Sequence, residues 1–192
     1  DIYIATAMIK TYVECGMLEK AKQVLGELPN RDVVSWNALM AGYSQHGLGE
    51  EILQCFKEMK EEGVTPDAVT YVFILKACGI VGSLEMGVDI DAKIRKQGLL
   101  ERDVVLGTAL MDMYSKCGAL EKAQEVFDEL LIRNVVTWNA LITGYVRDGL
   151  ADEALECFRK MQDEGACPNS VTYISTLKAC GLARSLEIGK AI

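Results

Sequence analysis

Two asparagines, Asn37 and Asn139, each follow a tryptophan in nearly identical segments, DVVSWNALMAGY from Asp32 and NVVTWNALITGY from Asn134. A carboxamide carries both a hydrogen-bond donor and an acceptor, so an exposed asparagine can bind a partner with the complementary pattern. The tryptophan before each asparagine belongs to an apolar helical stripe, so we expect the amide to lie beside the core and to be exposed. The pattern predicts polar recognition by repeated amide groups.

Groups that support catalysis or metal binding are scarce in this sequence. His46 is the only histidine, and Asp148 stands at the matching position of the second segment. There is no CxxC motif and no glycine-rich phosphate loop. Six cysteines recur in matched pairs, which we interpret as small buried apolar residues in a reducing compartment: Cys15/Cys117, Cys55/Cys157 and Cys78/Cys180. We expect no enzyme activity, no cofactor, no metal, no disulfide and no small-molecule substrate.

The two segments belong to an internal duplication with a period of 102 residues. Residues 1–90 align with residues 103–192 without a gap and are identical at 45 positions. Each copy divides into units of 31, 35 and 36 residues, the last of them incomplete: 1–31, 32–66, 67–102, 103–133, 134–168 and 169–192. Units near 34 residues predict a solenoid in which each unit buries its apolar face against its neighbours. The chain begins at Asp1, within the repeats and without a methionine, and we interpret it as an excerpt from a longer protein.

Each unit is expected to fold as two helices. In the second unit, glycines at 47 and 63 and Pro66 end two helical stripes of apolar residues, which are Trp36, Leu39, Met40 and Tyr43, then Ile52, Phe56 and Met59. No segment alternates long enough to indicate a strand, and no run of 18 apolar residues predicts a membrane span. The sequence therefore predicts an all-α fold, a right-handed α-solenoid superhelix of stacked helix-turn-helix repeats.

Four phrases carry a close resemblance to the pentatricopeptide repeat family, and the resemblance covers the whole chain: VVSWNALMAGY, EMKEEGVTPD, TYVFILKACG and MYSKCGALEKAQEVFDEL. The alternating unit lengths resemble the plant PLS subclass, in the order S, P, L, S, P and partial L. The resemblance implies single-stranded RNA as partner, at about one base per repeat, with the N-terminal repeats toward the RNA 5′ end. PLS proteins resemble organellar RNA-editing factors, which implies a mitochondrial or chloroplast location and an address-reading role. The zinc signature of the editing deaminase is not in this sequence.

The resemblance also implies that two positions per unit select the base: the position of Asn37 and the trailing residue of the repeat, which with the bounds given above is the first residue after the unit. The implied pairs are Thr6 with Asp32, Asn37 with Asp67, Val72 with Asp103, Thr108 with Asn134, and Asn139 with Asn169, and Ile174 stands alone in the incomplete unit. In the family, threonine goes with purines and asparagine with pyrimidines, while trailing aspartate goes with G or U and trailing asparagine with A or C. The implied target is 5′-G-U-N-A-C-3′, with U tolerated at the last position. The third base is unspecified because Val72 cannot hydrogen-bond a base edge.

Apolar residues near the start of each first helix have two interpretations. The resemblance implies that they sandwich the bases, whereas ordinary core packing is the alternative. The residues are Tyr3, Val34, Val69, Val105, Val136 and Val171.

The net charge of −8 opposes binding to phosphates, which normally rests on lysine and arginine. The expected first helices nevertheless carry a net charge of +3 and the rest of the chain −11, with those helices at 2–14, 33–45, 68–80, 104–116, 135–147 and 170–182. If the first helices line the concave face, that face is mildly basic. We expect modest affinity from so few repeats.

A protein-binding solenoid is the main alternative. Docking of editing cofactors through the L units would suit the apolar Val72 and Ile174. A peptide binder does not need a polar residue at the Asn37 position, yet all four complete S and P units have asparagine or threonine there. This pattern favours RNA binding, and an enzyme is a distant third interpretation.

Overall fold

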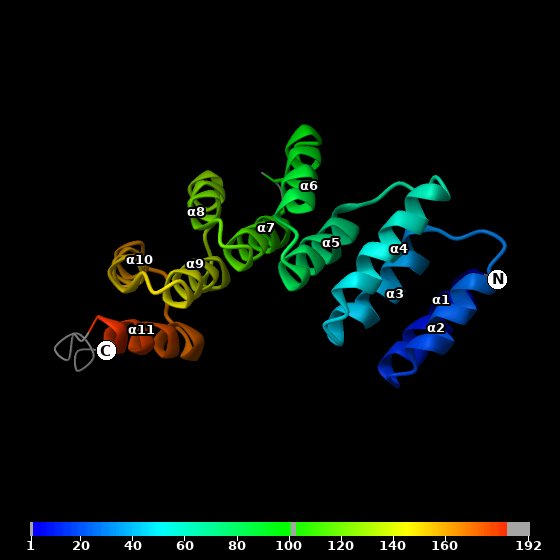
Figure 1. Ribbon diagram of the computed structural model, residues 1–192, viewed down its shortest axis with the longest axis horizontal. Coiled ribbons are helices and arrows are strands. Elements are labelled where there is room, and N and C mark those ends of the chain that lie inside the picture. The colour runs from blue at the N-terminus through cyan, green and yellow to red at the C-terminus, as the bar shows by residue number, and fades with distance from the viewer. Residues whose placement is uncertain (1, 101–102, 184–192) are drawn as a thin grey trace. The chain divides into compact units, whose positions relative to one another are not determined.

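The structure is a computed structural model that describes residues 2–100 and 103–183. In these ranges the chain forms eleven helices and no strand (Figure 1). It divides into two compact units, one ending at Ile94 and one beginning at Arg95. Within the described ranges, no helix has both the length and the apolar content that crossing a membrane requires.

The first compact unit consists of three helix pairs. Helices α1, α3 and α5 are the first helices of these pairs, and α3 packs against both α1 and α5. Helices α2 and α4 pack on α1 and α3, respectively. The bounds are α1 (Ile2–Glu14), α2 (Leu18–Glu27), α3 (Val33–Gln45), α4 (Gly49–Glu61), α5 (Ala68–Val81) and α6 (Leu84–Lys96), the last of which runs past Ile94.

The second compact unit repeats this arrangement. Helix α9 packs against both α7 and α11, and α8 and α10 pack on α7 and α9. The bounds are α7 (Val104–Lys116), α8 (Leu120–Glu129), α9 (Val135–Arg147), α10 (Ala151–Asp163) and α11 (Ser170–Leu182). These bounds confirm the expected first helices, with α5 one residue longer. The all-α solenoid is confirmed, while the division into S, P and L units stays a prediction.

The first helices begin where a short polar side chain caps them. The carboxylate or amide oxygen of the cap accepts backbone N–H bonds from the first turn, which would otherwise lack a partner. The caps are Asp32, Asp67, Asp103, Asn134 and Asn169. Each of these residues was expected to read a base, so the structure adds a second role in helix formation.

The apolar stripes of the second unit form the core as expected. Trp36, Leu39, Met40 and Tyr43 on α3, and Ile52, Phe56 and Met59 on α4, are all buried. Gly47 ends α3 with φ of 69°, and its equivalent Gly149 ends α9 with φ of 78°. Only glycine adopts this left-handed conformation without strain, so the turn between the paired helices depends on it.

The cysteine prediction is correct for four of the six paired residues. Cys55, Cys78, Cys157 and Cys180 are buried, and burial raises the pKa of Cys55 to about 12 and that of Cys157 to about 11. The prediction is wrong for Cys15, which is exposed, and Cys117 is only half-buried. Both directly follow the end of a first helix, Cys15 after α1 and Cys117 after α7.

One arginine in each compact unit, Arg31 or Arg133, links two second helices. Arg133 donates to the carbonyl oxygens of Phe127 (3.3 Å) and Asp128 (3.2 Å) at the end of α8, and to Glu164 Oε1 at the end of α10 (3.0 Å). Arg31 makes the matching bonds to Leu25, Gly26 and Glu62 in the other unit. Orphan carbonyls at a helix end are thereby satisfied.

Candidate nucleic-acid interface

The first P-unit pair is joined directly. Nδ2 of Asn37, on α3, donates to Oδ1 of Asp67, the cap of α5, over 3.0 Å. Oγ1 of Thr70, in the first turn of α5, donates to Oδ1 of Asn37 over 2.8 Å. Oδ1 of Asp67 also accepts the backbone N–H of Thr70 at 2.8 Å. The two residues that the sequence paired across 30 positions therefore share one hydrogen-bond network.

The second P-unit pair repeats this network in the other compact unit. Nδ2 of Asn139 donates to Oδ1 of Asn169 over 3.0 Å, and Thr172 Oγ1 donates to Oδ1 of Asn139 over 2.6 Å. Oδ1 of Asn169 also accepts the N–H groups of Val171 (3.0 Å) and Thr172 (3.1 Å). Thus the pair of two amides, Asn139 with Asn169, has the same arrangement as the pair of an amide and a carboxylate, Asn37 with Asp67.

The shared network determines which cap atom remains available to a ligand. The hydrogen bonds that the side chains of Asp67 and Asn169 accept from Asn37, Asn139 and the first helical turn end on Oδ1. The other terminal atom is an acceptor oxygen in Asp67 and an N–H₂ donor in Asn169. The atom that remains available to a ligand, Oδ2 of Asp67 or Nδ2 of Asn169, is therefore the atom by which aspartate and asparagine differ.

The expectation of a freely exposed amide behind each tryptophan is wrong. Asn37 is half-buried, and only 8% of the Asn139 surface is exposed. The carbonyl oxygen of each is occupied by a threonine hydroxyl, and one of the two N–H groups by the cap. Each asparagine retains one N–H that bonds neither the cap nor the threonine, so it offers a ligand a donor.

The first S-unit pair lines a hollow instead of forming a hydrogen bond. Thr6 and Asp32 border a cavity of about 240 Å³, together with Tyr3 and Val34, the expected base-sandwiching residues. Lys10, one turn further along α1, borders the same cavity. A flat ligand entering this cavity would meet a hydroxyl, a carboxylate and two apolar side chains.

Thr108 and Asn134 do not bond each other in the structure. Thr108 donates to its own helix, to the Val104 oxygen at 2.7 Å, while Asn134 caps α9. Val72 is half-buried on α5, and Asp103 caps α7 in the other compact unit. Ile174 is 55% exposed on α11. Apolar side chains at these two L-unit positions leave no group to bond a cap.

The residues expected to sandwich bases are all exposed. The exposed fractions range from 49% to 83%, for Tyr3, Val34, Val69, Val105, Val136 and Val171. Apolar side chains at the starts of first helices are therefore not core residues, so the core-packing alternative is wrong for this set.

The charges of the candidate surface are mixed. Burial raises the pKa of Asp67, but hydrogen bonds from Thr70, Asn37 and Val69 outweigh burial, so the pKa lies below its ordinary value of 3.8 and the group is ionised at neutral pH. Two first-helix cations are engaged, since Lys116 bonds Asp112 at 2.6 Å and Arg147 bonds Ser115 Oγ at 3.0 Å.

Three first-helix cations make no ion pair or hydrogen bond to another described residue. They are Lys10, Lys76 and Lys178, and all three are exposed. Each stands four residues after the base-reading position of its helix, at Thr6, Val72 and Ile174. Side chains four apart share one face of a helix, so each lysine lies beside a base-reading position.

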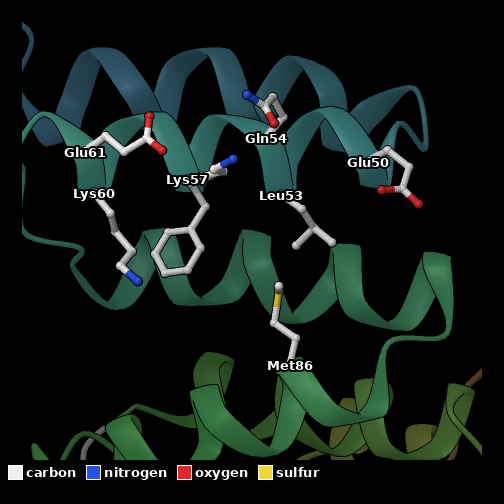
Figure 2. Close-up of a pocket in the computed structure, with 8 residues that line it drawn as sticks. Glu50, Leu53, Gln54, Lys57, Lys60, Glu61 and Met86 are labelled. Carbon is white, nitrogen blue, oxygen red and sulfur yellow. The ribbon is translucent and has the colours of Figure 1, made fainter.

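A second hollow, of about 650 Å³, lies along α4 (Figure 2). Its lining combines Lys57 and Lys60 with Glu50 and Glu61, so the charges cancel, and Met86 reaches it from α6. None of the expected base-reading residues borders it. Across the described residues, no three histidine, cysteine or acidic side chains gather where they could hold a metal ion.

The sequence interpretation missed Thr70 and Thr172. Both are fully buried, and both bond the two members of a P-unit pair. A recognisable signal was present, because a capping Asp or Asn followed three residues later by a hydroxyl residue is a capping-box pattern. That pattern predicts the bond to the cap but not the bond to the preceding unit.

Stacked helix pairs with one polar pair per P unit define an α-solenoid of the repeat class. A family model described as "PPR repeat family" matches residues 31–79 and 133–181, and one described as "PPR repeat" matches residues 3–33 and 108–135. The chain therefore belongs to the pentatricopeptide repeat family.

Curated relatives agree with this assignment. A putative pentatricopeptide repeat-containing protein of Arabidopsis thaliana is 42% identical over 193 residues, covering 100% of this chain and 38% of the relative. A chloroplastic relative from the same plant is 38% identical and a mitochondrial one 36% identical, with 24% and 41% of their lengths covered. The chain thus spans less than half the length of these relatives.

Solved structures show the same fold. The pentatricopeptide repeat protein PPR10, in complex with an 18-nt psaJ RNA element, superposes with a TM-score of 0.81 at 21% identity, over 100% of this chain and 29% of PPR10. The PPR domain of Arabidopsis thaliana protein-only RNase P 1, in complex with tRNA, gives a TM-score of 0.71 at 14% identity, over 94% of this chain and 98% of that domain.

Proposed function

We propose that this chain binds single-stranded RNA in a sequence-specific manner, at about one base per helix pair, with the preference 5′-G-U-N-A-C-3′ and U tolerated last. The observation that carries the proposal is the direct hydrogen bond within each P-unit pair, Asn37 with Asp67 and Asn139 with Asn169. Bonded side chains act on a ligand as one unit. Single-stranded RNA leaves the base edges free for such a unit.

The chemistry of the available cap atom supports the different bases. Oδ2 of Asp67 only accepts hydrogen bonds, which suits the N3–H of U. The amide nitrogen of Asn169 donates, which suits the bare N3 of C. The remaining N–H of Asn37 or Asn139 suits a base carbonyl, which both pyrimidines carry at O2. The cavity at Thr6 and Asp32, with Tyr3 and Val34 on its wall, supports a base as ligand of the first unit.

We further propose that the chain is the address-reading part of an organellar RNA-editing or RNA-processing factor of the PLS type, acting in the mitochondrion or the chloroplast. The unit lengths of 31, 35 and 36 residues support the subclass, and relatives named chloroplastic and mitochondrial support the compartment. On this proposal the chain itself selects RNA and carries out no chemistry.

The test is a competition assay between GUNAC-containing RNA and a scrambled RNA of equal composition and length, at one fixed salt concentration. We expect tighter binding of the GUNAC sequence, and Asn139→Ala should reduce the ratio between the two RNAs. Gln54→Ala is the matched control, because Gln54 is an exposed amide on α4 that bonds Glu58 away from every pair. Equal affinity for both RNAs would refute the proposal.

A protein-binding role for the L units is a second candidate. Tyr173, Ile174 and Leu177 on α11 are 39%, 55% and 49% exposed, which makes an apolar surface at an L-unit position. Docking of an editing cofactor at this surface would be compatible with RNA binding by the S and P units. Leu177→Asp should then abolish cofactor binding and leave RNA affinity unchanged, as measured by separate pull-down and RNA titrations.

A further inference from the structure

We propose that Thr172, and to a smaller extent Thr70, is a positioning residue that holds the preceding asparagine in the orientation needed to select a pyrimidine. This inference rests on the proposed RNA binding. It concerns a hydroxyl that contacts no base and belongs to a different helix pair from the asparagine it orients. The observations are the same bonds in two separate compact units.

A single proton gives the hydroxyl its orienting effect. Oγ1 of Thr172 lies 2.6 Å from Oδ1 of Asn139 and 3.1 Å from Oδ1 of Asn169, and it accepts the Asn169 N–H at 3.0 Å. A hydroxyl has one proton to donate, and the shorter distance assigns that proton to Asn139. The carbonyl of Asn139 is thereby directed at Thr172, and its NH₂ group at Asn169.

The opposite orientation of the Asn139 amide would be unfavourable. It would place the carbonyl oxygen of Asn139 against Oδ1 of Asn169, and two acceptors 3.0 Å apart repel each other. It would also leave the buried hydroxyl of Thr172 without its acceptor. With the hydroxyl in place, Asn139 presents an N–H to the ligand, and the O2 of a pyrimidine is a suitable acceptor.

The two P units should depend on this hydroxyl to different extents. In the first, the partner of Asn37 is the carboxylate of Asp67, and a charge-assisted bond alone favours the same amide orientation. In the second, the partner is the neutral Asn169, whose oxygen already serves Val171 and Thr172. Loss of the hydroxyl should therefore matter more at Thr172 than at Thr70.

The experiment measures the preference for C over A at the fifth RNA position. Both bases suit the trailing Asn169, so the preference between them depends on how Asn139 distinguishes a pyrimidine from a purine. Thr172→Val removes the hydroxyl and keeps the side-chain shape. The C-to-A ratio should fall by roughly fivefold, the ratio that one net hydrogen bond supports. Thr172→Ser keeps the hydroxyl and should retain the wild-type ratio. Thr70→Val should reduce the U-to-G ratio at the second position by less.

Thr137→Val is the matched control for helix capping. Thr137 occupies the same place in α9, and its hydroxyl bonds the N–H and the C=O of Asn134 at 3.0 Å and 2.8 Å but does not bond Thr108. Thr137→Val should lower the melting temperature and leave the fourth-base preference unchanged.

An unchanged C-to-A ratio in Thr172→Val would overturn the inference. A loss of fourth-base preference in Thr137→Val as large as the loss of fifth-base preference in Thr172→Val would also overturn it. Absence of any preference in the wild-type chain would instead overturn the proposed function. If Thr172→Val fails to fold, the Thr70→Val and Thr70→Ser pair decides the same question at the second base.

Discussion

Oδ1 of Asn169 accepts a hydrogen bond from Asn139 at 3.0 Å, and the same oxygen caps the first turn of α11. One side chain thus caps a helix of one pair and belongs to the proposed RNA-binding surface of the preceding pair. Since the cap uses only the oxygen, the amide nitrogen remains as the group that distinguishes asparagine from aspartate.

Asn169→Asp should change the fifth base preference from C toward U. The mutation keeps Oδ1 as cap and as acceptor for Asn139, and replaces only the donor nitrogen with an acceptor oxygen. One hydrogen bond contributes roughly 1 kcal/mol, so the change should be several-fold. A four-base competition assay at the fifth position measures it. An unchanged preference order with intact affinity would show that the pairing rule does not hold for this chain.

Lys76→Ala and Lys178→Ala should weaken binding to every RNA sequence about equally. Both lysines are exposed, make no bond to another described residue and stand beside base-reading positions that are apolar. Each loss should reduce the slope of log affinity against log salt by about 0.7, the value for one phosphate contact on a single strand. Lys57→Ala on α4 is the control and should leave the slope unchanged. A sequence-dependent effect of Lys76→Ala would argue against phosphate contact.

Arg133→Lys should lower the free energy of unfolding by about 1 kcal/mol, because the single nitrogen of lysine cannot reach the three acceptors that the three guanidinium nitrogens contact separately. Glu164→Gln should cost less than about 0.5 kcal/mol, since the ion pair is partly exposed. Urea unfolding monitored by circular dichroism compares the two variants. Equal losses would indicate that the ion pair, rather than the capping of α8, is the stabilising contact.

Asp67→Asn should make the stability of the first compact unit less sensitive to acid. The folded-state pKa of Asp67 lies below its ordinary value of 3.8, so the ionised group stabilises the fold above that pH and loses this contribution as pH falls through the folded pKa. The difference in unfolding free energy between wild type and Asp67→Asn should therefore shrink below pH 3.8. Asn169→Asp should introduce the matching acid dependence in the second compact unit. Urea titrations at pH 7 and in the acid range test both.

Much of the fold was predictable from the sequence because it depends on periodic features. Apolar spacing located the first helices, and the duplication identified which residues are equivalent. The pairing of Asn37 with Asp67 came from the family resemblance, and the structure shows the bond between them. The exposure of Val34 and its equivalents was left open, because an apolar residue near a helix start suits a core or a ligand equally well.

The orientation of the asparagine amides was not predictable from the sequence. Helical periodicity places Asn139 one step from the core, but its burial depends on how closely α11 packs against α9. The bond from Thr172 crosses between helix pairs, so no local pattern signals it. Threonine in place of asparagine removes this contact in the S units, where Thr108 bonds its own helix instead.

The dual role of the capping residue limits how such repeats can be exchanged as cassettes. On the proposed function, a cassette that begins at Asn134 would bring its own cap for α9 and would also change the base that the preceding unit selects. A cut placed after the first helical turn, beyond Thr172 in the next unit, would keep asparagine, cap and hydroxyl from one source. Engineering of new RNA addresses should therefore transfer the segment from the first helix of one pair through the first turn of the next.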